Sequence, residues 1–270
     1  MKIRSRNRRL RELPVNSLIP NILTVLALCA GMSSIRFAMQ EKWELAVAAI
    51  LVAGVLDGLD GRMARLLKGA TKFGAELDSL SDFIAFGVAP ALVIYLWSTE
   101  VLGGIGWIAG LAYSTCCALR LARFNTALDD PDPPAWASYF FTGMAAPAAA
   151  CMVLLPMAVS FQLGDGVVRE PVFMACWLVA VAFLMISRIP TYSFKQVRVK
   201  RGMVLPLLVV VGMAAAVLAS YPWFVLSVAG LLYLASIPMS YRAQLRFAAA
   251  QPAAEEGAVK DPETDREETS

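Results

Sequence analysis

Acidic and basic residues gather in one short stretch, Asp57 to Asp82, and long apolar runs flank it on both sides. The stretch contains five acids and four bases: Asp57, Asp60, Glu76, Asp78 and Asp82, with Arg62, Arg65, Lys68 and Lys72. An ionisable residue at membrane depth is costly, so this concentration of charge indicates a functional site.

The spacing of the aspartates indicates what the site does. Asp57 and Asp60 are three residues apart and Asp78 and Asp82 four apart, so each pair lies on one face of a helix. A turn over 68–72 would bring the two pairs face to face. Four carboxylates in a chain without histidine favour Mg²⁺, Mn²⁺ or Ca²⁺ over zinc or copper. A salt-bridged helical hairpin at a membrane surface would explain the charges, but not the paired spacing.

The same residues match a family pattern. The stretch reads D-x2-D-G-x2-A-R-x8-G-x3-D-x3-D, and this resembles the signature of the CDP-alcohol phosphatidyltransferases. The fixed positions are Asp57, Asp60, Gly61, Ala64, Arg65, Gly74, Asp78 and Asp82. The resemblance implies that an alcohol displaces CMP from a CDP-linked lipid, with two Mg²⁺ or Mn²⁺ ions at the site. Two ions about 3.5–4 Å apart suit such phosphoryl chemistry.

The resemblance also implies roles for individual residues. Asp57, Asp60, Asp78 and Asp82 would bind the metal ions, and Asp82 would also act as the catalytic general base. The residues expected to contact CDP-diacylglycerol are Asn21, Thr24, Gly61, Arg65 and Thr71. Asn21 and Thr24 are included because Pro-Asn-x-Leu-Thr is similar to the first span of this family. A proline-softened helix, with these two side chains bonded to neighbours, is the alternative there.

Three further stretches resemble one branch of the family, the integral-membrane phosphatidylserine synthases of bacteria and archaea. They are LRLARFN at 119–125, FTGMAAPAAA at 141–150 and LMISRIPTYSFK at 184–195. This branch implies L-serine as the acceptor alcohol and a homodimer. Glycerol 3-phosphate, an inositol phosphate or choline are alternative acceptors. A cation transporter that uses the carboxylates as its ion site is an alternative of a different class.

Basic residues outside the motif are candidates for binding a phosphate or the serine carboxylate. Arg120 and Arg123 lie at i and i+3 on one helical face, and paired arginines can hold a phosphate bidentately. Arg188 and Lys195 are further candidates, either as lipid-phosphate contacts or as anchors at the membrane interface.

Composition indicates an all-α, polytopic membrane bundle. Apolar residues make up 58% of the 270 residues and charged residues 17%, and the mean hydropathy is +0.61. Eight apolar segments are long enough to cross, at about 16–36, 44–66, 82–98, 103–124, 139–161, 172–190, 204–220 and 222–241. Only Tyr221 and Pro222 separate the last two, so six or seven spans are also possible.

The distribution of basic residues predicts the orientation. With eight spans and a cytoplasmic N-terminus, 21 of the 24 Lys and Arg residues lie inside, and only Arg36, Lys42 and Arg169 lie outside. Both termini and the active site would then face the cytoplasm at the cell membrane. We expect a basic arm at 1–14, bound to anionic lipid rather than nucleic acid, a membrane domain at 15–245 and a disordered acidic tail at 246–270.

Overall fold

The computed structural model describes residues 18–67, 71–128, 140–142, 144–187, 190–192, 213, 216–217 and 220–250. The chain divides into two compact units. The first comprises 1–130 and 145–186, and the second comprises 131–144 and 187–270. The predicted basic arm at 1–14, Arg188 and Lys195 lie outside the described residues.

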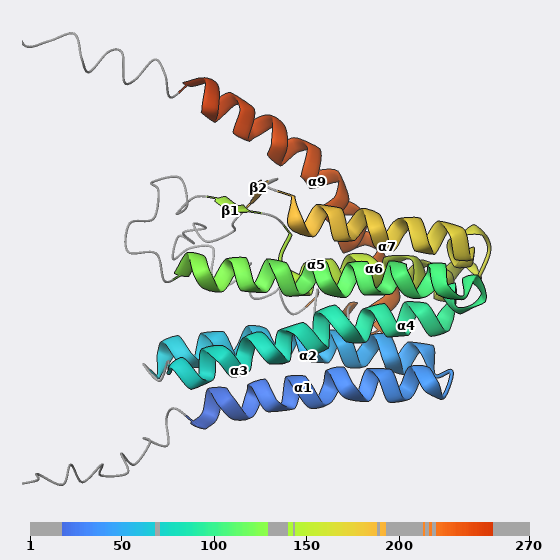
Figure 1. Cartoon of the computed structure of the whole chain (residues 1–270), viewed down its shortest axis with the longest axis horizontal. Coiled ribbons are helices and arrows are strands. Elements are labelled where there is room, and N and C mark those ends of the chain that lie inside the picture. The colour runs from blue at the N-terminus through green and yellow to red at the C-terminus, as the bar shows by residue number, and fades with distance from the viewer. Residues whose placement is uncertain are drawn as a thin grey trace, which may run out of the picture. The chain divides into compact units, whose positions relative to one another are not determined.

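Helices make up the first unit (Figure 1). They are α1 (Leu18–Met39), α2 (Trp43–Leu66), α3 (Lys72–Asp82), α4 (Ala89–Trp97), α5 (Gly104–Leu128), α6 (Ala146–Leu163) and α7 (Pro171–Ile186). Three short helical turns join them: η2 (Phe83–Val88), η3 (Thr99–Leu102) and η5 (Val167–Arg169).

The second unit contains α9 (Pro222–Ala250) and two short strands, β1 (Phe140–Thr142) and β2 (Pro190–Tyr192). The strands pair antiparallel, with Phe141 opposite Thr191. The sequence did not predict this pair. Helix α9 continues to Ala250, five residues into the segment expected to be a disordered tail, and 251–270 lie outside the described residues.

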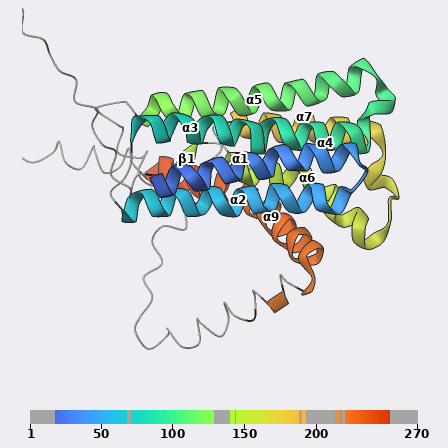
Figure 2. The ribbon, with the colours of Figure 1, turned by 90° about the horizontal axis from the view of Figure 1, so that it is seen from below.

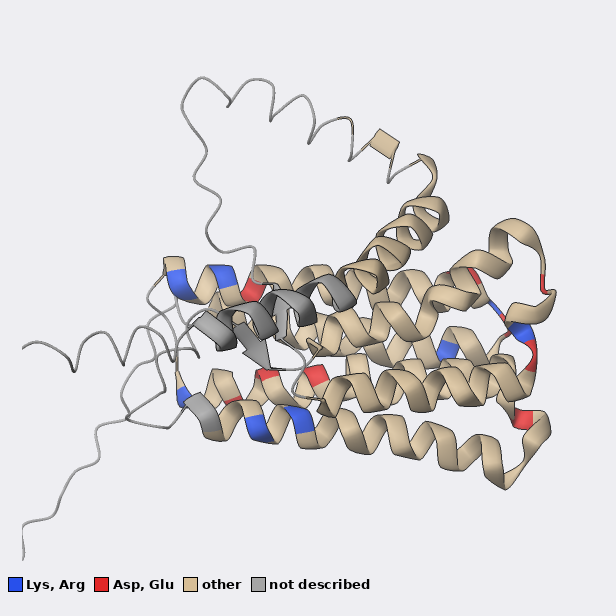
Figure 3. Cartoon of the chain, turned by 90° about the horizontal axis from the view of Figure 1, so that it is seen from above, with Lys and Arg blue, Asp and Glu red and all other residues tan. Residues whose placement is uncertain are grey.

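The predicted helical membrane fold is confirmed. Four helical stretches of the described chain are long and apolar enough to cross a bilayer: Leu18–Met39, Lys72–Trp97, Gly104–Thr126 and Ala146–Leu163. Two apolar helices are shorter, Pro171–Ile186 and Pro222–Ser236. Figure 3 shows charged residues near both ends of the first unit's helices and long uncharged stretches between them. The count of eight spans and the cytoplasmic location of the termini stay predictions, and most of the segment at 204–220 is not described.

The helix that contains the third predicted span begins before that span. We expected the span at about 82–98, and one helical stretch runs from Lys72 to Trp97 through α3, η2 and α4. The charged residues of the motif lower the hydropathy of α3, so hydropathy alone does not indicate where this helix begins. The middle segment, η2, is π-helical and directly follows Asp82. Single π-helical turns inside α-helices are rare and often lie at functional sites.

Helix α1 lies along α2 and also contacts α3, η2 and α4, while α5 lies along α7 (Figures 1 and 2). Close packing of α1 depends on Gly31. A Cβ at Gly31 would lie 2.8 Å from the Cα of Ala85 in η2. Because that neighbour is backbone and cannot rotate away, only glycine allows α1 to approach the π-helical segment.

A group of polar contacts around Arg169, called the Arg169 clasp below, joins helix ends at the end of the first unit opposite the aspartate motif. The Arg169 Nη1 atom lies 2.6 Å from Asp165 Oδ2, and Arg169 Nε donates to the Trp97 carbonyl oxygen at 3.2 Å. The Arg169 guanidinium also lies 5.6 Å from the centroid of the Trp97 ring. The Ser98 hydroxyl donates to the Arg169 carbonyl oxygen at 2.8 Å. These contacts fix the end of α4 to the connection between α6 and α7.

We predict that Arg169→Gln lowers thermal stability without changing the fold. The ion pair is partly exposed and is worth about 0.2–1 kcal/mol, and the exposed cation–π contact adds about 0.5–1 kcal/mol. The unfolding midpoint in detergent should fall by about 2–4 °C for each kcal/mol lost. An unchanged midpoint would show that the clasp does not stabilise the protein.

The same clasp predicts a pH dependence. A hydrogen bond from the Ser160 hydroxyl, at 2.6 Å, and the hydrogen bond from Arg169 lower the pKa of Asp165 below its ordinary value of 3.8. A lowered pKa stabilises the fold at higher pH, and this stabilisation is lost as the pH falls through the folded-state pKa. The advantage of the wild type over Asp165→Asn in unfolding midpoint should therefore be present at neutral pH and disappear below 3.8. An advantage that grows on acidification would contradict this assignment.

Candidate active site

Two helices bring the predicted carboxylates together. Asp57 and Asp60 lie on α2, and Asp78 lies on α3. Carboxylate oxygens of these three residues lie within 4.8 Å of one another. Asp82, one turn further along α3, has its side chain within hydrogen-bonding reach of Asp57. The predicted face-to-face arrangement of the two pairs is therefore present.

Helix α1 supports the carboxylates through Thr24, which is buried. The Thr24 hydroxyl donates to Asp60 Oδ2 at 2.7 Å, a shorter contact than the 3.0 Å to the Pro20 carbonyl oxygen. The Ser81 hydroxyl on α3 donates to the Thr24 carbonyl oxygen at 3.1 Å. One residue of α1 thus contacts both carboxylate-bearing helices. The sequence favoured the substrate cavity for Thr24, with a hydroxyl bonded to neighbours as the alternative, and it indicated neither Asp60 nor Ser81 as a partner.

Gly74 allows the start of α3 to lie against α1. A Cβ at Gly74 would lie 2.8 Å from Asn21 Oδ1 and 3.2 Å from Thr71 Oγ1. Thr71 is the N-cap of α3, and its hydroxyl accepts a hydrogen bond from the Gly74 backbone nitrogen at 3.0 Å. Thr71, which was predicted to contact substrate, therefore also caps the helix that carries Asp78 and Asp82. Asn21, which carries the same prediction, lies against the start of that helix.

Gly61 and Arg65 lie on α2, next to Asp60 and one turn beyond. A Cβ at Gly61 would meet only the Arg65 side chain, at 3.9 Å. Packing within the described protein therefore does not require glycine at this position, which leaves room for a ligand to approach the backbone. Arg65 is exposed, so its guanidinium is accessible.

Two of the predicted site residues, Arg120 and Arg123, lie on α5. Arg123 Nη1 donates to the Ile186 carbonyl oxygen at the end of α7, at 3.3 Å, and Arg120 is half-buried one turn earlier. Asn125, not among the predicted site residues, donates from Nδ2 to the Ser79 hydroxyl oxygen at 2.8 Å. Ser79 follows Asp78, so this bond links α5 to the helix that holds two of the carboxylates. Sequence spacing does not reveal such a contact over 46 residues.

The donor set fits a divalent metal ion of the hard class. Three carboxylates offer oxygen atoms close enough to share an ion, and a fourth lies beside them. Oxygen ligands of this kind suit Mg²⁺ and Mn²⁺. Asp57, Asp60 and Asp78 would hold the ion, and Asp82 stands next to that position.

The stretch that carries the carboxylates lies within a match to a known family. The family model described as CDP-alcohol phosphatidyltransferase matches residues 17–187, and the model described as CDP-alcohol phosphatidyltransferase 2 matches 202–238. A Mycobacterium leprae protein named CDP-diacylglycerol–serine O-phosphatidyltransferase is 40% identical over 254 residues, which cover 94% of this chain and 83% of the relative. A Helicobacter pylori protein of the same name is 38% identical over 192 residues, 69% of this chain and 77% of the relative. An archaetidylserine synthase of Methanothermobacter thermautotrophicus is 34% identical over 173 residues, 63% of this chain and 68% of the relative.

The family match and the relatives named as transferases indicate a membrane enzyme rather than a cation transporter. The chain belongs to the CDP-alcohol phosphatidyltransferase family, because that family's model covers more than half of its length. The resemblance inferred from the motif is thereby confirmed.

Thr24 offers a test of how the site is positioned. We predict that Thr24→Val lowers kcat/KM by about 10–100-fold, because a hydrogen bond to a charged group is worth about 1.5–3 kcal/mol. The substitution keeps the shape of the side chain and removes only the hydroxyl that contacts Asp60. Thr24→Ser, which keeps the hydroxyl, should retain most of the activity. Equal rates for the valine variant and the wild type would contradict the role of this bond.

Proposed function

We propose that the chain transfers a phosphatidyl group from CDP-diacylglycerol to L-serine, forming phosphatidylserine and CMP. The observation that carries the proposal is the convergence of Asp57, Asp60, Asp78 and Asp82 from two helices. The relatives named as serine and archaetidylserine transferases support serine as the acceptor.

Asp82 acts as the general base in this proposal. The serine hydroxyl gives its proton to Asp82 while its oxygen forms a bond to the lipid-side phosphorus, and the bond from that phosphorus to the CMP oxygen breaks. Asp57, Asp60 and Asp78 would hold two Mg²⁺ or Mn²⁺ ions, and Asp82 would complete the second site. When bound, such ions neutralise charge on the pyrophosphate and on the departing CMP.

Neighbouring residues bind the lipid nucleotide. Gly61 lets the nucleotide approach the backbone of α2, and Arg65 and Thr71 contact its phosphates and sugar. Asn21 and Thr24 line the same region from α1 while they orient α3 and Asp60. Arg120, Arg123, Arg188 and Lys195 are proposed, as a group, to attract the lipid phosphate or the serine carboxylate.

The proposal includes a location and an assembly. The protein lies in the cell membrane, and its carboxylate site opens to the cytoplasm, where the nucleotide and serine are available. The excess of Lys and Arg in the segments assigned to the inside supports this orientation. A homodimer is the proposed assembly, by analogy with the family.

CMP release by the purified protein tests the reaction. The assay contains CDP-diacylglycerol and Mg²⁺ or Mn²⁺ in detergent, and compares L-serine, glycerol 3-phosphate, an inositol phosphate and choline as acceptors. We expect release that depends on serine, with phosphatidylserine as the lipid product. Release with a different acceptor would overturn the substrate and keep the metal site. No release with any acceptor would overturn the proposed reaction.

A further inference from the structure

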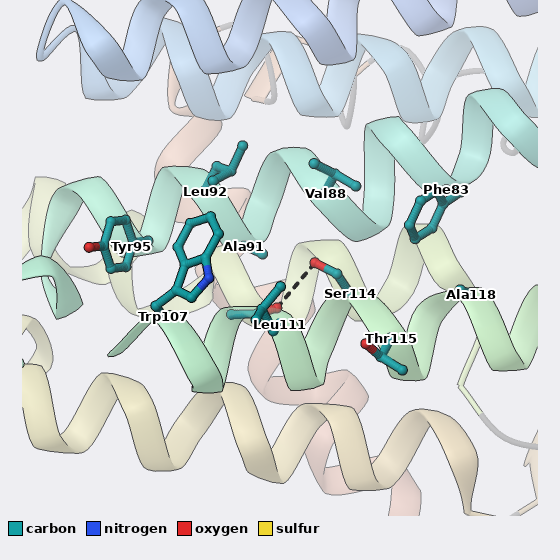
Figure 4. A pocket seen from close by; sticks show the side chains of 11 residues that line it. Phe83, Val88, Ala91, Leu92, Tyr95, Trp107, Leu111, Ser114, Thr115 and Ala118 are labelled. Carbon is teal, nitrogen blue, oxygen red and sulfur yellow. Dashed lines mark hydrogen bonds between the residues drawn. The ribbon is translucent and has the colours of Figure 1, made fainter. Parts of the chain in front are cut away.

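An apolar groove runs between two helical stretches that are long and apolar enough to cross a membrane, from Phe83, which directly follows Asp82, towards Tyr95 at the other end. Its walls come from η2 and α4 on one side and from α5 on the other (Figure 4). The groove has a volume of about 360 Å³. None of the side chains that line it is ionisable except Tyr95, so none of the four carboxylates contributes to its lining.

The groove exists because small residues face each other across the helix pair. Ala91 on α4 and Gly110 on α5 lie opposite each other, since a Cβ at Gly110 would be 3.9 Å from the Ala91 Cβ. Ala118 lines the inner end near Phe83 (Figure 4). The Ser114 hydroxyl donates toward the Gly87 and Gly110 carbonyl oxygens, both at 3.1 Å, so its polar group is satisfied by backbone. The hollow therefore presents hydrocarbon surface.

An aromatic pair closes the end of the groove farther from the carboxylates. Tyr95 and Trp107 form an edge-to-face contact, with centroids 5.3 Å apart and ring planes at 78°. Trp107 lies in the first turn of α5 and is 45% exposed. Tyrosine and tryptophan at the end of a span are typical of the membrane interface. The groove thus begins at one membrane surface and runs inward.

The length of the groove matches the depth of one leaflet. Phe83 and Tyr95 are twelve residues apart, which is about 18 Å at a helical rise of about 1.5 Å per residue. One leaflet supplies about half of a hydrocarbon core that is about 30 Å thick. Both walls belong to stretches that are long and apolar enough to cross a bilayer. Leu111, on the rim, is 48% exposed, so the groove opens sideways.

We propose that this groove binds one acyl chain of a bilayer phospholipid, from the leaflet at the end of the bundle opposite the carboxylates. A flexible hydrocarbon chain fills a narrow apolar hollow and gains dispersion contacts that bulk lipid, in looser packing, does not make. The binding is separate from the reaction proposed above, since it uses neither the aspartates nor the nucleotide.

Trp107 provides a direct probe, because bromine atoms on an acyl chain quench tryptophan fluorescence on contact. The purified protein in detergent is titrated with a phosphatidylglycerol whose chains are brominated, and the Trp107 signal is the difference between wild type and Trp107→Phe. We expect quenching that saturates near one lipid per chain. Quenching that rises in proportion to lipid, without saturation, would overturn the proposal.

Two alanines on α5 give a matched pair of variants. Ala118→Leu fills the inner end of the groove, whereas Ala122→Leu adds the same side chain one turn further on, outside the lining. We expect at least a fivefold weaker lipid affinity for Ala118→Leu and an unchanged affinity for Ala122→Leu. Gly110→Leu, which fills the middle of the groove, serves as a second filling variant if Ala118→Leu does not fold. Equal lipid affinities for the wild type and for the variants with a filled groove would overturn the proposal. A second copy of the chain that covers the groove and shields it from lipid would also overturn it.

Discussion

Replacing Asp82 with asparagine is expected to abolish nearly all turnover while leaving nucleotide and metal binding in place. A general base contributes about 10²–10⁴-fold to rate, and asparagine keeps the shape of the side chain but cannot accept the proton of an acceptor hydroxyl. Asp82 stands beside Asp57 at the end of α3, next to the grouped oxygens of the other three aspartates. This position suits a group that receives a proton close to the metal ions.

The measurement separates chemistry from binding. CMP release gives kcat, and calorimetric titration with CDP-diacylglycerol and with Mn²⁺ gives the two affinities. Glu76→Gln is the matched control, because Glu76 is an exposed acid on the same helix and lies outside the carboxylate group. Normal turnover in Asp82→Asn would eliminate the general-base assignment, and loss of metal affinity alone would reassign Asp82 as a ligand only.

Replacing Asp78 with asparagine is expected to act through the metal instead. Asp78 is the residue of α3 whose oxygen completes the group with Asp57 and Asp60 on α2. A metal ion stabilises transition-state charge by several kcal/mol, so its loss should lower kcat/KM by roughly 10²–10⁴-fold. Part of the loss should return as the Mn²⁺ concentration rises, because two of the three carboxylates remain.

The dependence on metal concentration distinguishes the two aspartates. The Mn²⁺ concentration for half-maximal activity should shift upward most in Asp78→Asn, because Asp78 belongs to the group of three oxygens. It should shift much less in Asp82→Asn, whose amide oxygen can still complete the second site, and not at all in Glu76→Gln. An unshifted metal dependence in Asp78→Asn would mean that its carboxylate does not bind the activating ion.

Spacing within the motif was sufficient to predict the core of the site. Residues three and four apart on a helix share a face whatever the rest of the chain does, so the pairing of Asp57 with Asp60 and of Asp78 with Asp82 follows from local geometry. The two helices then place the pairs within reach of each other. The family signature could be read for the same reason, because its fixed residues lie within 26 positions.

Contacts between distant segments could not be predicted in this way. The bond from Thr24 to Asp60 spans 36 residues and that from Asn125 to Ser79 spans 46. Both depend on how whole helices pack, which periodicity does not specify. The start of the helix that contains the third span could not be predicted for a related reason: hydropathy measures affinity for lipid, whereas the helix beginning at Lys72 is held by a threonine cap and by α1.

The π-helical segment after Asp82 has a consequence for how this protein tolerates changes in length. A π-helical turn holds about one residue more than an α-helical turn, which shifts the helix on its two sides out of phase by about 100°. If 83–88 became regular α-helix at unchanged length, Asp78 and Asp82 would rotate by about 100° about the helix axis relative to α4. The carboxylates would then no longer face α2, although every one of them would still be present. Deleting one residue within 83–88 would instead remove the extra residue of the π-helical turn and leave both sides in phase. This segment should therefore tolerate the loss of one residue better than the regular α-helix on either side of it.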